Sequence, residues 1–256
     1  MPAATTKIPE RHIDLYRRWV GEFVVIVLGV LAALAVDSWS EERNNRVLEQ
    51  EYLARISEDL NRDIAEIEET INASILQGRS ATTLLSILDD PLADHVPRFR
   101  SDALKAIDFS VPANEEFDIQ VKRLVWLVAR DRNFSPRRNT YDELLATGRI
   151  VVIDDPVLRT SIIEHYALIE DVVEDLQGWA LIPAEKYSTF LATSTGFNAY
   201  DFNAIDDPIP LLQEAKGLPA YLRDVRRVSL RHAFRLESVD ESSRRLLALI
   251  DSYTHD

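Results

Sequence analysis

The chain contains no cysteine among its 256 residues. Disulfide bonds, thiolate metal sites and thiol nucleophiles are therefore excluded, while either side of a bacterial membrane remains compatible with the composition. Glycine is scarce as well, with seven residues and no glycine-rich tract, which favours long helices over many tight hairpins. Hydrophobic residues nevertheless make up 46% of the chain, so we expect a packed core rather than a disordered polymer.

Recognisable catalytic motifs are missing too. The sequence holds no GxSxG, P-loop, GxGxxG or HExxH pattern, the arrangements that position a nucleophile, a phosphate group or a zinc ion. None of the five histidines has a glutamate three residues earlier, so the Glu-x-x-His ligand pattern of di-iron helical proteins is absent. We therefore expect no enzyme activity, no cofactor and no bound metal ion.

Basic side chains are outnumbered by acidic ones, 29 against 43, and the formal net charge is −14. Residues 1–36 hold four basic and three acidic side chains, a net charge of +1, which leaves −15 on the remainder. A body this acidic repels phosphate backbones, so nucleic acid is not an expected partner.

One long apolar run stands near the N-terminus, VGEFVVIVLGVLAALAVDSWSEERN at residues 20–44. Its uninterrupted part, residues 23–36, is fourteen residues long, which is short for a membrane-spanning helix. Trp19 and Trp39 flank it twenty residues apart, and a helix of that length covers about 30 Å, the hydrocarbon thickness of a bilayer. Because tryptophan is enriched at both membrane interfaces, a transmembrane helix is predicted at residues 19–39.

Two other interpretations of this run compete with a membrane anchor. Ala33-Leu34-Ala35 has the form of a signal-peptide cleavage site, and Arg17-Arg18 resembles a twin-arginine signal. A buried core helix is the third possibility, although the run lacks a polar stripe. A retained anchor is preferred because no proline occurs between Pro9 and Pro91 and apolar periodicity resumes at Val47.

The distribution of Lys and Arg predicts the topology. Four basic residues precede the span, while only Arg43 and Arg46 follow it closely, which favours a cytoplasmic N-terminus. We expect a cytoplasmic segment at residues 1–18, the transmembrane helix in the bacterial inner membrane, and an extracytoplasmic, periplasmic helical domain at residues 40–256. The lipid bilayer is thus one expected partner.

Apolar residues recur at helical spacing beyond the anchor. The first series repeats every eleven residues, which predicts a nearly straight helix that continues from the anchor to about Leu76. Gly78 either breaks this helix or is passed by it, and a further apolar stretch reaches Leu88 before Asp89-Asp90-Pro91 stops it. The series consists of Leu53, Ile56, Leu60, Ile64, Ile67, Ile71 and Ile75.

Capping signals predict further helices. They are expected near 100–108, near 116–130, from Thr140 to Gly148, from Pro156 after a cap at Asp154 or Asp155 to a kink or break at Gly178 and Pro183, and from Pro219 almost to the C-terminus. Residues 150–153 are expected to be an extended link and residues 196–218 an irregular loop. The predicted fold class is mostly α, with one N-terminal transmembrane helix continuing into a long helix of an antiparallel bundle of four or five helices.

Two stretches resemble a bacterial family of single-pass membrane proteins of unknown function. The matching residues are Gly21, Glu22, Trp39, Glu42 and Arg43 around the anchor, a Tyr52, Leu53, Asp59 and Leu60 pattern after it, and Tyr141, Leu144 and Gly148 in NTYDELLATGRIVVIDDPVLRTSIIEHY. The match covers about a third of the chain, and the anchor is richer in alanine than is usual in that family. The resemblance implies a topology and no chemistry.

The anchor carries two candidate contact features. Glu22 lies at the edge of the span, where an acidic residue can contact another transmembrane subunit, or can simply reach the headgroups or pair with Arg18. Gly29 and Ala33 form a small-xxx-small pair that permits close helix approach and hence a homo-oligomer. Together with Trp19 and Trp39 they are the predicted anchor and partner-contact residues.

Four arginines form a basic stripe near the C-terminus, at Arg223, Arg227, Arg231 and Arg235, with Arg226 alongside. Such a stripe can bind an anion, lipid headgroups or an acidic partner. The preferred interpretation is pairing with the acidic face of the first long helix.

The remaining candidates are polar clusters on predicted helices. Glu164, His165 and Tyr166 are adjacent in sequence, although a lone histidine on such a face is usually a core residue. Asp59, Asp63 and Glu66 share one helical face and could bind a cation, but a solvated face is the preferred interpretation.

The leading functional hypothesis is a non-enzymatic scaffold or accessory subunit of an envelope complex, with a protein partner in the membrane or periplasm. The alternative is an extracytoplasmic ligand-sensing bundle that works through a partner subunit. A third hypothesis is an enzyme centred on Glu164, His165 and Tyr166.

Overall fold

The computed structural model describes residues 11–95, 117–130, 132–179 and 181–255. Across these ranges the protein is mostly helical, and they contain no β-strand. The mostly α fold class predicted from periodicity is therefore confirmed, while the short helix predicted near 100–108 lies outside the described residues.

The first element, α1 (Arg11–Ile87), is a single helix of 77 residues. The chain divides into two compact units, Met1–Tyr52 and Leu53–Asp256, so α1 contributes to both. The helix passes Gly78 without a break and is followed by a turn in which Asp89 has a φ of 50°.

The helices that follow α1 match most of the predicted positions. They are α3 (Phe117–Ala129), α4 (Asn139–Ala146), the 3₁₀ turn η1 (Arg149–Val152), α5 (Pro156–Trp179), α6 (Leu181–Thr195), the 3₁₀ turn η2 (Asp201–Ala204), α7 (Ile209–Glu214) and α8 (Leu218–His255). Two predictions were wrong: residues 150–153 fall mostly in η1 rather than in an extended link, and residues 196–218 contain η2 and α7 rather than only irregular loop.

Helix ends show which capping signals act. The Asp155 carboxylate accepts a hydrogen bond from the backbone N–H of Leu158 at 2.7 Å, with Pro156 in the first position of α5, as the sequence predicted. Gly148 has a φ of 68° directly after α4, the left-handed conformation that favours glycine. Thr140 does not cap α4, because its hydroxyl donates to the Asp59 carboxylate on α1 instead.

The buried face of α1 in the second unit differs from the predicted apolar stripe. The buried positions are Leu53, Ile56, Leu60, Asp63, Ile67, Thr70, Ser74, Gly78, Ser80, Ala81, Leu84 and Leu85. From Leu53 to Ser74 the spacing alternates between three and four residues, close to a heptad pattern rather than the expected eleven-residue repeat. Ile64, Ile71 and Ile75 are only half-buried. At these points the buried face of the helix is formed instead by the polar residues that precede them, Asp63, Thr70 and Ser74.

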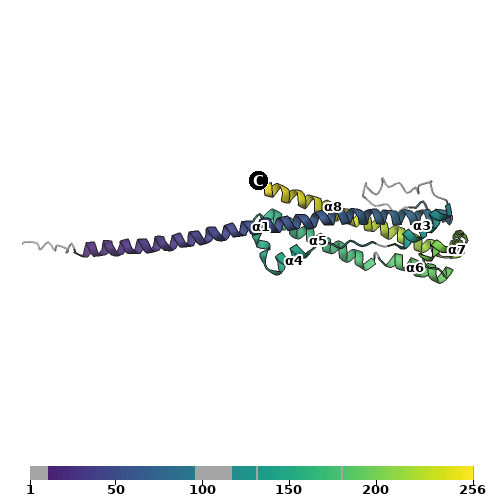
Figure 1. Ribbon diagram of the computed structural model, residues 1–256, viewed down its shortest axis with the longest axis horizontal. Coiled ribbons are helices and arrows are strands. Elements are labelled where there is room, and N and C mark those ends of the chain that lie inside the picture. Colours follow the sequence, from purple (N-terminus) through teal and green to yellow (C-terminus); the bar gives the residue numbers. More distant parts are fainter. Residues whose placement is uncertain (1–10, 96–116, 131, 180, 256) are drawn as a thin grey trace, which may run out of the picture. The chain divides into compact units, whose positions relative to one another are not determined.

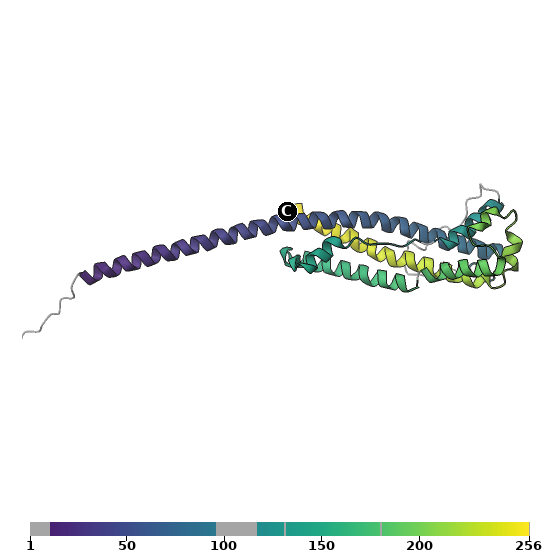
Figure 2. The same cartoon turned by 60° about the horizontal axis from the view of Figure 1, so that its bottom comes forward.

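One apolar cluster of the second unit lies at one end of it, and further buried apolar residues, such as Leu60, Ile162 and Leu236, lie along the rest. In this cluster the end of α1 packs with α3, α6, η2, α7 and the start of α8 (Figures 1 and 2). Fully buried members include Leu84, Val125, Tyr187, Phe202 and Leu222. Burying this apolar surface supplies the main stabilisation of that end.

Three long helices form the other half of the second unit: the part of α1 beyond Leu53, α5 and α8 (Figure 2). At Gly78, a Cβ would lie 3.0 Å from the Ser229 hydroxyl and 3.4 Å from Leu230, so the missing side chain permits the close approach of α8 to α1. Polar residues are buried along this seam, among them Asp63, Ser74, His165, His232 and Ser243.

Candidate functional site

The apolar segment of α1 is exposed throughout. Every described side chain from Glu22 to Trp39 is exposed, and Trp19 and Trp39 expose 69% and 61% of their surface. Among the described residues, this is the one helix long and apolar enough to cross a membrane. The described part of the chain places no atom within 4 Å of a Cβ built at Gly29, so the face with Gly29 and Ala33 is open to a second helix.

The basic stripe is paired inside the chain, and its partners differ from those predicted. The ion pairs join Arg223 to Asp90 at 2.6 Å, Arg227 to Asp224 at 3.1 Å, Arg231 to Asp175 at 3.2 Å and Arg235 to Asp171 at 2.7 Å. These four aspartates lie in the turn after α1, on α8 itself and on α5. Since residue numbers fall along α8 as they rise along α5, these two helices run in opposite directions.

Arg226 has a structural role that spacing alone did not reveal. It is buried, and its guanidinium donates to the carbonyl oxygens of Leu92, Ala93 and His95 in the turns after α1. Burial lowers the pKa of Arg226 from its ordinary value. The side chain closes the end of α1 by satisfying three backbone acceptors there.

The acidic residues of α1 hold an extended segment, residues 132–138, and the start of α4. We call this segment the strap. Its contacts are Glu69 with Arg132, Glu66 with the N–H of Ser135 and with Arg137, Asp63 with the N–H and guanidinium of Arg137, Asp59 with the Thr140 hydroxyl, and Arg55 with Glu143. The interpretation of Asp59, Asp63 and Glu66 as a solvated face is therefore wrong, and Arg137 occupies the place where a cation could bind.

Asp63 is the central carboxylate of these contacts. It is 1% exposed and lies 2.9 Å from the Arg137 guanidinium. Burial raises its pKa to about 6, against the lowering effect of Arg137. The strap is thus fixed by a charge that is costly to bury and that depends on its partner.

Glu164, His165 and Tyr166 point to different surroundings. Tyr166 stacks on Tyr141 at 4.2 Å between ring centroids, on the side of α5 that faces α4. His165 faces α8, where its Nδ1 lies 2.9 Å from the Ser242 hydroxyl. Glu164 is exposed. The His165 and Tyr166 rings also meet edge to face, with 5.2 Å between their centroids, so the structure brings these two residues together.

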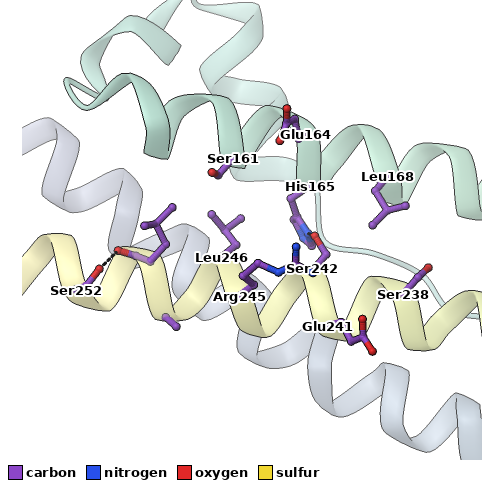
Figure 3. Close-up of a pocket in the computed structure, with 12 residues that line it drawn as sticks. Ser161, Glu164, His165, Leu168, Ser238, Glu241, Ser242, Arg245, Leu246 and Ser252 are labelled. Atoms are coloured by element: carbon purple, nitrogen blue, oxygen red, sulfur yellow. Dashed lines mark hydrogen bonds between the residues drawn. The ribbon is translucent and has the colours of Figure 1, made fainter. Parts of the chain in front are cut away.

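Glu164 and His165 share a groove between α5 and α8, with a volume of about 760 Å³ (Figure 3). The α5 side contributes Ser161, Glu164, His165 and Leu168, and the α8 side contributes Ser238, Glu241, Ser242, Arg245, Leu246, Ala248, Leu249 and Ser252. Sequence analysis missed the α8 side, although Ser238 and Ser242, with Arg245 and Leu249, recur on one face at helical spacing.

His165 and Ser242 are placed as a base and a nucleophile could be, but their electrostatics are unfavourable for that chemistry. Burial lowers the pKa of His165 to about 4, so the imidazole is a weak base at neutral pH. Its other ring nitrogen is buried, and no described residue accepts or donates a hydrogen bond there, whereas an activated pair needs an orienting group at that atom.

His232 on α8 resembles His165, since it is buried and one of its ring nitrogens lies near a serine hydroxyl. Its Nδ1 lies 3.3 Å from the Ser74 hydroxyl on α1, and burial lowers its pKa to about 4.

Within the described residues, no three His, Asp or Glu side chains are grouped so that they could hold a metal ion. Comparison with protein-family models, curated proteins and solved structures finds no match for this chain.

Proposed function

We propose that this protein is a non-enzymatic, single-pass membrane protein of the bacterial inner membrane. Its helical domain would be an antiparallel bundle on the periplasmic side, serving as a scaffold or accessory subunit for a protein partner. The observation that carries the proposal is the exposed apolar segment of α1, which has an interfacial tryptophan at each end. Exposing so much aliphatic surface to water would be costly, whereas a bilayer accommodates it.

The continuity of α1 supports a role in assembly. The apolar segment and the first helix of the second unit belong to one helix, without a glycine- or proline-rich linker. Such a connection suits a protein that holds a partner near the membrane better than one that captures diffusing substrates. The resemblance of the anchor and the NTYDELLATGR stretch to single-pass proteins supports the same topology.

The cysteine-free sequence makes the topology straightforward to test. Single cysteines at Thr6 and at the exposed Asn203 would each be the only thiol in the chain. In intact spheroplasts, a membrane-impermeant maleimide is expected to label Asn203→Cys and to label Thr6→Cys only after lysis. Labelling of both sites, or of Thr6→Cys alone, would contradict the proposed orientation.

The partner is tested by gentle extraction of the native protein followed by native mass spectrometry. We expect a stoichiometric protein partner. Glu22→Gln should abolish its binding if the contact lies in the membrane, and Arg227→Glu should abolish it if the contact involves the exposed surface of α8. Arg62→Glu is the matched control, since it changes an equally exposed arginine on α1. Recovery of only a bare monomer would contradict the scaffold hypothesis.

A further inference from the structure

The groove between α5 and α8 is lined by charged side chains of both signs that the fold leaves unused. Glu164 belongs to α5, while Glu241 and Arg245 belong to α8. Among the described residues, none forms a hydrogen bond or an ion pair with any of these three side chains. Figure 3 shows Arg245 reaching from α8 toward Ser242 between the two helices, with Glu164 on α5 and Glu241 on α8.

The neighbouring residues show that this lack of pairing is local. Asp240 and Arg244 have the same four-residue spacing as Glu241 and Arg245, and they form an ion pair of 2.8 Å. Arg244 also reaches Glu68 on α1. One position further along α8, the corresponding pair is not formed, and its members line the groove instead.

A buried polar group supplies the second, independent observation. His165 is 2% exposed and lines the groove, with one ring nitrogen bonded to Ser242. The other ring nitrogen, Nε2, is buried and has no hydrogen-bond partner among the described residues. Because His165 lines the groove, this unused nitrogen is a hydrogen-bonding group available to a ligand or to a bound water there.

The combination of groups restricts the chemistry of the occupant. Two carboxylates beside one guanidinium disfavour a simple anion, and Arg245 disfavours a bare metal cation. A molecule with both a carboxylate and an ammonium group satisfies both signs at once, with the guanidinium binding the carboxylate. Leu168, Leu246 and Leu249 provide an apolar surface between the charged groups.

We propose that this groove binds a small zwitterionic molecule of the amino-acid class. Its carboxylate pairs with Arg245, its ammonium group with Glu164 or Glu241, and its apolar part lies against the leucines. Bound in this way, the ligand bridges α5 and α8. The site is independent of the proposed scaffold role, because it requires neither a membrane nor a protein partner.

The test is thermal unfolding of the full-length protein in mild detergent, with each of the twenty L-amino acids added at 10 mM. At least one amino acid is expected to raise the Tm, by roughly 5 °C at concentrations far above its Kd. The same molecule without its amino group, and the same molecule without its carboxylate, are expected to have no effect. Absence of a shift with all twenty amino acids overturns the proposal.

Matched variants then locate the site by calorimetric titration of the active amino acid. Arg245→Gln and Glu241→Gln are each expected to weaken binding at least tenfold, as the loss of one charged partner does. Arg244→Gln is the control, because Arg244 is adjacent, equally exposed and paired outside the groove. Circular dichroism verifies that the variants are folded. Equal weakening by Arg244→Gln, or unchanged affinity in Arg245→Gln, overturns the assignment.

Discussion

At the scale of single residues, buried polar groups distinguish this protein from a simple apolar bundle. His165 and His232 are held neutral by burial, with pKa values lowered to about 4. Burial shifts the pKa of Asp63 in the opposite direction, upward to about 6, because it disfavours the charged carboxylate. Each shift makes the free energy of unfolding depend on pH, because the folded and unfolded chains bind protons differently.

The two histidines and Asp63 contribute to the pH dependence of the free energy of unfolding with opposite signs. An unfolded histidine has a pKa near 6.5, so the unfolded chain binds more protons between pH 6.5 and 4, and stability falls as the solution is acidified. Folded Asp63 binds its proton more tightly than unfolded aspartate, so its contribution increases as the pH falls from about 6 to 4. Two histidines oppose one aspartate, and the net effect of acidification is destabilising.

We predict that the free energy of unfolding is at least about 1 kcal/mol lower at pH 5 than at pH 7. In the double variant His165→Gln and His232→Gln, the sign of this difference should reverse, because Asp63 then dominates. Urea unfolding of the detergent-solubilised protein at the two pH values measures both. A wild-type protein that is more stable at pH 5 would contradict the prediction.

At the scale of elements, the strap is the least expected feature. Residues 132–138 have no regular helix or strand structure, yet they are bound along α1 by Glu69, Glu66 and Asp63. The strap leads into α4, whose Tyr141 stacks on Tyr166 of α5. Polar contacts, one aromatic stack and the burial of Phe134 and Leu144 thus attach this part of the chain to the long helices.

The contacts of the strap differ in burial, which gives a matched pair of variants. Arg137→Ala removes the guanidinium from the buried Asp63 and should reduce the free energy of unfolding by about 2 kcal/mol at pH 7. Arg132→Ala removes an ion pair with the exposed Glu69 and should cost less than about 1 kcal/mol. Thermal unfolding compares them, and equal losses would show that burial of Asp63 is not what fastens the strap.

At the scale of the whole molecule, the two compact units differ in solvent preference. The unit Met1–Tyr52 contains an exposed apolar segment, whereas Leu53–Asp256 contains its own buried core. The second unit should therefore fold without the anchor, since its core residues come from α1 beyond Leu53 and from the later helices.

Deletion of residues 1–40 tests this independence. The shortened protein is expected in the soluble fraction, with a Tm within about 3 °C of the full-length protein, because none of the core residues that the structure describes lies in the deleted segment. Sedimentation after lysis and thermal unfolding measure the two properties. An insoluble product, or a much lower Tm, would show that the anchor is part of the folding unit.

The sequence by itself determined features that depend on local chemistry. The exposed apolar segment between Trp19 and Trp39, the Asp155 and Pro156 start of α5, and the left-handed Gly148 follow from hydrophobicity, side-chain hydrogen bonding and backbone sterics, which act over a few residues. These signals are readable without knowledge of the fold.

Only the tertiary structure decided which polar residues are buried. Ile64 and Asp63 are adjacent, and hydrophobicity favours burying the isoleucine, yet Asp63 is the one inside. Arg137, seventy-four residues away, reverses the preference by supplying a charge and a backbone N–H. The α5 and α8 groove arises in the same way, because His165 and Ser242 meet only when distant helices pack, and a partner that far along the chain leaves no trace in local periodicity.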